Sequence, residues 1–136
     1  MAGERNWVHR SKHVPWGGGT GAGEIYKLGA DWSGAAFVWA FSTTKNGSPA
    51  FTLNAAAAGV QGVSATYDAS YIHPSSGEVV GATRIVPQID EATLEGLTYT
   101  GTDDLVLYYD LLVTPTGEPQ RVIAYGTLTI RQGIGD

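Results

Sequence analysis

Hydrophobic and polar residues alternate along several segments, and the clearest alternation runs from residue 105 to residue 113. Every second residue there is apolar, in the order Leu105, Leu107, Tyr109, Leu111 and Val113. The same period of two recurs over residues 37–41, 63–71 and 122–130. Such alternation predicts strands with one buried face. We therefore expect an all-β protein, an antiparallel β-sandwich of the Ig-like or jelly-roll-like kind.

The turn residues divide the chain into strands. Asn46-Gly47 favours a tight hairpin, Pro87 ends a strand because it cannot donate to a ladder, and Pro115–Pro119 joins the last two strands. The expected strands are 35–42, 50–53, 62–72, 78–86, 105–114 and 121–131. One short helix is expected over 89–97, capped by Asp90 and ended by Gly96, and 55–58 is a candidate helical turn.

The first 28 residues show neither a period of two nor one of 3.6. They include a glycine run, 17–23, with the composition of a flexible link. We interpret 1–16 as an extended N-terminal arm, 17–23 as its hinge and 29–136 as the β-sandwich domain. The arm carries the candidate assembly contacts, which are Arg5, Trp7, Arg10 and Trp16. Tryptophans outside any strand pattern are typical of a surface that packs on a partner.

The composition is that of a globular domain with little charge. Hydrophobic residues make up 43% of the chain and charged residues 15%, against a usual charged share of about 25%. This balance suggests that part of the surface is covered by something other than water. The first twelve residues lack an apolar stretch and the longest apolar run has seven residues. We therefore expect a soluble protein with no signal peptide and no membrane partner.

The charge is unevenly distributed. Residues 1–27 contain four basic and two acidic residues, whereas the remainder contains four basic and eleven acidic residues. Four scattered cations are too few for binding through phosphates, which commonly uses about six or more contacts. We expect no nucleic-acid partner, and complementarity between the arm of one copy and the body of another is at least as good an explanation.

No group of residues demands catalysis. The glycine run lacks the preceding strand and following helix of a nucleotide loop. His9 and His13 are four residues apart, but Pro15 argues against a helix that would align them on a metal. Asp110 lies in an apolar strand and is either solvated on a partly covered face or accepts a hydrogen bond from a neighbour. The chain has no cysteine, which excludes disulfides and thiolate sites. We expect no enzyme, metal or cofactor.

The body resembles the small β-sandwich domains of tailed-bacteriophage tails and baseplates, in particular the N-terminal domain of upper baseplate and tail-fibre proteins. The resemblance covers about residues 29–131 in order. It rests on Gly29–Gly34 leading into Phe37–Phe41, on Asn46–Pro49, on the short helix 90–97, on Tyr109-Asp110-Leu111 and on the closing Gly126–Ile130.

The resemblance implies a structural virion protein, made in the host cytoplasm and located in a tail, baseplate, neck or fibre-attachment structure. Its partners would be itself and other virion proteins, in a homo-oligomer such as a trimer or hexamer. A capsid decoration protein is one alternative. Another is a carbohydrate-binding module that uses exposed aromatic residues such as Tyr67, Tyr71, Tyr99 and Tyr108.

Overall fold

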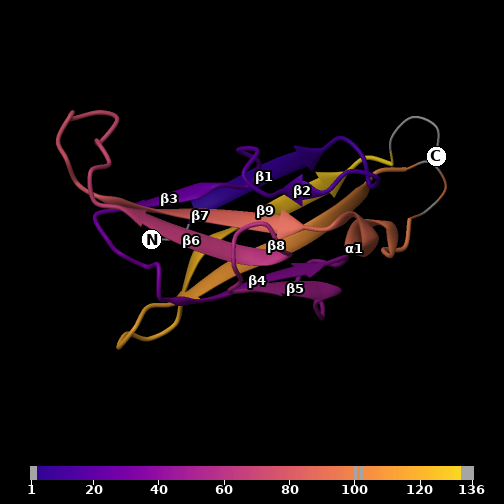
Figure 1. Ribbon diagram of the computed structural model, residues 1–136. Coiled ribbons are helices and arrows are strands. Elements are labelled where there is room, and N and C mark those ends of the chain that lie inside the picture. Colours follow the sequence, from indigo (N-terminus) through magenta and orange to yellow (C-terminus); the bar gives the residue numbers. More distant parts are fainter. Residues whose placement is uncertain (1–2, 100, 102, 133–136) are drawn as a thin grey trace.

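The computed structural model describes residues 3–99, 101 and 103–132, which form two β-sheets packed face to face (Figure 1). The larger sheet has the order β1-β9-β8-β4-β5. Its strands are β1 (Gly3–His9), β4 (Ala36–Ser42), β5 (Phe51–Asn54), β8 (Leu105–Thr114) and β9 (Arg121–Ile130). The smaller sheet is built on β7 (Ala82–Ile89), which pairs with β2 (Trp16–Gly17), β3 (Ile25–Leu28) and β6 (Gly62–Asp68).

The prediction of an all-β sandwich with one short helix is confirmed. The helix among the described residues is α1 (Glu91–Glu95), and no helix there is long and apolar enough to cross a membrane. The expected antiparallel arrangement needs one correction, because β1 runs parallel to β9 over Gly3–His9. The first and last strands thus lie side by side in a mixed sheet.

The prediction of an N-terminal arm on a flexible hinge is wrong for residues 3–28. This segment supplies β1 to the larger sheet and both β2 and β3 to the smaller one. Three glycines of this run, Gly17, Gly18 and Gly23, lie close to other parts of the chain, whereas Gly19 and Gly21 face open space. A side chain at Gly17 would collide with the carbonyl oxygen of Pro87, and one at Gly23 would collide with the ring of Trp16. Both have positive φ, 82° and 71°, which glycine adopts without strain.

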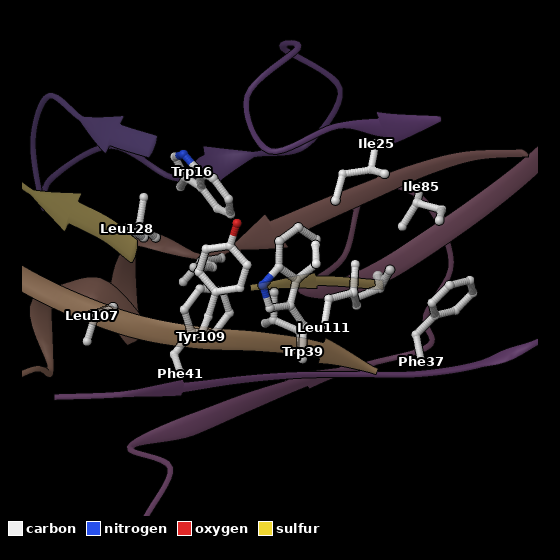
Figure 2. Packing of buried hydrophobic residues seen from close by; sticks show 14 of the residues in the cluster. Trp16, Ile25, Phe37, Trp39, Phe41, Ile85, Leu107, Tyr109, Leu111 and Leu128 are labelled. Carbon is white, nitrogen blue, oxygen red and sulfur yellow. The ribbon is translucent and has the colours of Figure 1, made fainter. Parts of the chain in front are cut away.

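Trp16 lies at the centre of the core, with 2% of its surface exposed. Its ring inserts between the two sheets and meets aromatic rings of the larger sheet edge to face (Figure 2). The ring centroids are 6.2 Å from Trp39 and 6.5 Å from Phe41, both with an interplanar angle of 85°. Aromatic pairs favour this geometry beyond the area they bury. Trp16 therefore binds the N-terminal segment to the sandwich.

Several predicted boundaries are shifted. The strand expected over 62–72 ends at Asp68, and residues 55–58 form no helical turn, since Ala55 makes a β-bridge to Val63. Asp90 stands at the helix N-cap without a capping side-chain hydrogen bond. The strand expected over 78–86 lies at 82–89 and includes Pro87. The Pro87 carbonyl accepts the Gly18 N–H at 2.8 Å, so its donor-less nitrogen faces the glycine loop between β2 and β3.

A β-bulge reverses one expected side-chain direction. The period of two placed Val122 on the buried face together with Ala124. In β9 the pairing shifts from Leu111↔Ala124 to Leu112↔Val122, which leaves Ile123 as an extra residue. The extra residue turns Val122 to the outer face, where it is exposed.

We expect Trp16→Ala to lower the free energy of unfolding by about 3–5 kcal/mol, because it leaves a cavity between the sheets. Denaturant unfolding followed by circular dichroism measures this change. Val8→Ala, at an exposed position of β1, is the control and should change stability by less than about 0.5 kcal/mol. A loss below about 1 kcal/mol for Trp16→Ala would restore the interpretation of this segment as a detachable arm.

Lowering the pH should reduce the free energy of unfolding, in part because Glu24 becomes protonated. Arg84 donates two hydrogen bonds to this carboxylate, each 2.8 Å long, and they lower the pKa of Glu24 despite partial burial. The ionised form therefore stabilises the fold above the pKa of the unfolded chain, and this contribution disappears as the pH falls through the lower folded pKa. We expect Glu24→Gln to lose less unfolding free energy than the natural chain between pH 7 and pH 3. Equal losses in the two proteins would contradict this assignment.

Candidate functional site

The outer face of the larger sheet holds a groove with a volume of about 470 Å³. Most of its strand residues alternate with the core residues of the same strands and point away from the smaller sheet, whereas Phe41 and Tyr109, which also line it, belong to the core. The groove is lined by Glu4 from β1, Ala40, Phe41 and Ser42 from β4, Tyr108, Tyr109 and Asp110 from β8, Tyr125, Gly126 and Thr127 from β9, and Thr44, Lys45, Asn46, Gly47 and Pro49 from the β4–β5 loop.

Cross-strand register gives the groove its shape. Glu4, Tyr125, Asp110 and Ala40 are consecutive partners across β1, β9, β8 and β4, and form one row of side chains. The next row contains Thr127, Tyr108 and Ser42. The small side chain of Ala40 leaves space beside the two tyrosines.

The β4–β5 loop, residues 43–50, forms one wall of the groove. The Ser42 hydroxyl donates to the Thr44 carbonyl at 2.8 Å, and the Ala50 N–H donates to the Phe41 carbonyl at 2.7 Å. Asn46 has a φ of 61°, a left-handed conformation that asparagine tolerates better than most residues. These bonds hold Lys45 and Asn46 at the rim, where both are exposed.

The outer face around the groove is largely apolar. Val8, Val106, Val122 and Tyr125 are exposed on it, with Tyr125 at 43% and Val8 at 64%. Among the described strand residues of this face, the charged side chains are Glu4 and Asp110. Exposed apolar surface of this kind, with a few polar groups in it, is typical of a face that binds another molecule.

The hydroxyl of Tyr109 holds β1 in place beside the groove. It donates to the Arg5 carbonyl at 2.6 Å and accepts the Trp7 indole N–H at 3.2 Å. Burial raises the pKa of Tyr109, while the hydrogen bond from Trp7 lowers it less strongly. On the other side of β1, Asn6 accepts hydrogen bonds at 3.0 Å from the N–H and hydroxyl of Thr127. These contacts position Glu4 at the rim.

The four predicted assembly residues occupy different environments. Trp16 is buried in the core, so the prediction that it contacts a partner is wrong. Trp7 is half-buried and packs against Trp16, with the two ring centroids 6.3 Å apart. Arg5 and Arg10 are exposed on and just beyond β1, and their role in assembly stays a prediction.

The histidines near the N-terminus do not share one helical face. His9 is buried in β1 and its Nε2 contacts the Val14 carbonyl, whereas His13 pairs with Glu95 at 2.7 Å. One ligand atom each from His13, Glu91 and Glu95 lies within 4.8 Å of the others, a set that suits a zinc-type ion. All three side chains are exposed, and His13 and Glu95 are already within hydrogen-bond distance of each other, so we assign no metal to them.

The tyrosines proposed for glycan binding are dispersed. Tyr71 stacks on Tyr26 with ring centroids 5.3 Å apart, and the Tyr99 hydroxyl donates to the Leu94 carbonyl at 2.8 Å. Tyr108 alone among the four lines the groove, where it is joined by Tyr125. Alternation along β9 places Tyr125 between the inward-facing Ala124 and Gly126, so the period of two was a signal for its position on the outer face.

No protein-family model matches the chain, and no curated protein is significantly similar to it in sequence.

We expect Tyr109→Phe to destabilise the protein by about 1–3 kcal/mol, because the Arg5 carbonyl and the Trp7 N–H lose their shared partner. Hydrogen exchange of the β1 amides should accelerate more than exchange in β4. Tyr108→Phe, the neighbouring residue on the outer face, serves as the control. If exchange in β1 is unchanged, the Tyr109 hydroxyl does not hold this strand.

Proposed function

We propose that this chain is a structural protein of a tailed-bacteriophage particle, built into a tail, baseplate, neck or fibre-attachment structure. The resemblance of residues 29–131 to small β-sandwich domains of phage tails and baseplates supports this location. The proposal gives the chain no catalytic role and identifies its partners as further copies and other virion proteins.

The apolar outer face of the larger sheet is the observation that carries the proposal. Four large apolar residues are exposed there while its strands contribute two charges, Glu4 and Asp110. The opposite outer face is more polar, because Arg84 and Glu24 form an ion pair there and Ser64, Thr66 and Gln88 alternate with the core residues, although Tyr26 is also exposed on it. This asymmetry supports one face as the contact with a neighbouring chain, since depletion of charge marks the cores of protein interfaces.

Carbohydrate binding is the second candidate. It is favoured by the two tyrosines of the groove, Tyr108 and Tyr125, which lie near Asp110 and the amide of Asn46. Aromatic surface combined with a few fixed polar groups is the usual composition of a small-ligand site. A titration of tyrosine fluorescence with a broad glycan panel tests this function, and a flat response would remove it.

Mass spectrometry of purified particles from the source culture tests the structural role. We expect the polypeptide at a fixed copy number in multiples of three or six. Its absence from the particles would contradict the proposal.

A double variant, Val106→Ser with Val122→Ser, tests whether the outer face of the larger sheet makes the contact that incorporates the chain into particles. Both residues are exposed, so the chain should fold normally, while incorporation should fall by about a hundredfold if each valine loses about 1.5 kcal/mol of burial. The control is Val60→Ser, which changes an exposed valine outside this face and outside the β6–β7 connection, and it should be incorporated normally. Normal incorporation of the Val106/Val122 variant would exclude this face as the contact.

A further inference from the structure

The hairpin that connects β6 to β7, residues 69–81, extends away from one end of the sandwich (Figure 1, upper left). Its two arms remain paired beyond the sheet. The His73 N–H donates to the Glu78 carbonyl at 2.8 Å, the Val80 N–H donates to the Tyr71 carbonyl at 2.9 Å, and Ile72 forms a β-bridge with Val79. The hairpin is therefore a defined projection of the sheet.

The tip and the base of the hairpin are both held in place. At the tip, the ring Nδ1 of His73 accepts the N–H groups of Ser75 at 3.0 Å and Ser76 at 3.2 Å. At the base, Tyr71 stacks on Tyr26 of β3. A preorganised element loses little conformational entropy when it binds. The hairpin is thus suited to enter a preformed site.

Two apolar side chains lie uncovered on this projection. Ile72 is 58% exposed and Val79 is 66% exposed, and the bridge places them opposite each other. Both lie outside the hydrophobic core of the described chain. An ordered, projecting pair of this kind is an element that gains free energy by insertion into another apolar surface.

We propose that the hairpin of one copy docks into the outer-face groove of the next copy, so that chains join head to tail. This inference rests on the proposed structural role and names the partner as a second copy of the same chain. Ile72 and Val79 would lie against the groove tyrosines, which supply aromatic surface for them.

Individual polar pairs support a second copy as the occupant, although Glu4 and Asp110 make the groove lining acidic as a whole. The hairpin contributes Glu78, and the groove offers Lys45 at its rim. Because Nδ1 of His73 accepts backbone N–H groups, a neutral His73 carries its proton on Nε2 and can donate to a groove carboxylate such as Asp110. Glu78 and His73 of the hairpin thus each have an opposite or accepting group in the groove.

Head-to-tail docking uses a different patch on each partner. Such heterologous contacts form a closed ring when the rotation between copies closes, and a filament when it does not. The arrangement leaves one hairpin and one groove free at the ends of an open chain. It therefore allows many copies to assemble from a single type of contact.

Charge reversal tests the contact in the full-length purified chain. We expect sedimentation to show concentration-dependent association of the natural chain, and expect Glu78→Lys or Lys45→Glu alone to weaken it about tenfold or more by placing like charges together. An equimolar mixture of the two variants should restore association, because the hairpin lysine introduced in one chain then meets the rim glutamate introduced in the other. Glu118→Lys, an identical change on the β8–β9 turn, is the matched control and should associate normally.

Cysteine cross-linking provides a second readout, since the chain has no cysteine of its own. Chains with Val79→Cys and Lys45→Cys, distinguished by tags of different size, should form a mixed disulfide dimer on oxidation. A mixture of Val60→Cys and Lys45→Cys chains should not.

A natural chain that stays monomeric at millimolar concentration overturns the inference, as does a mixture of charge variants that fails to associate. If such a chain is nevertheless present in particles, the structural role stands with a different occupant of the groove. If the mixed variants associate but particles lack the chain, the head-to-tail contact stands and the virion role falls.

Discussion

The insertion of Trp16 between the two sheets is the constraint on which the rest of the structure depends. Its ring meets Trp39 and Phe41 of the larger sheet, while its backbone pairs with Ile89 of the smaller one. The segment that carries it continues into β1 in one direction and β3 in the other. Removal of this ring would therefore loosen both edges of the sandwich at once, because β1 and β3 are tied to the core through the same short stretch of chain.

The alternation of apolar residues predicts the strands that make most of the core contacts. The observed bounds of β8 match the predicted range, and those of β4 and β9 differ from it by one residue. These strands are covered on one face along most of their length, so the period of two survives in the sequence except at the Ile123 bulge of β9. The N-terminal segment carries no such signal. β1 is an edge strand whose partner, β9, lies more than a hundred residues away, and its residues Glu4–Asn6 are all exposed. A contact of that separation leaves no local pattern.

Two further features could not be predicted from the sequence alone, namely the close packing within the glycine run and the set of residues that line the groove. Glycines needed for close packing against Trp16 and Pro87 have the same composition as glycines in a flexible link, and only the neighbouring atoms distinguish them. The groove likewise depends on register. Alternation places Asp110 and Tyr125 on the outer faces of their strands, but the pairing that puts them in one row with Glu4 and Ala40 cannot be predicted from the period of two. Lys45 joins them from a loop whose direction no periodicity predicts.

The energetics of the exposed elements favour assembly through many weak contacts over one strong contact. A single hairpin offers two apolar side chains and one or two polar pairs, which is a small contact compared with the roughly 800 Å² per partner of a stable pairwise complex. Small contacts become effective when each copy is held by two neighbours, because the second contact then forms at a high effective concentration. The apolar valines beside the groove, Val8, Val106 and Val122, extend the surface available to a neighbour once the hairpin is docked. A protein organised in this way would associate only weakly as free chains and become stable within a closed ring.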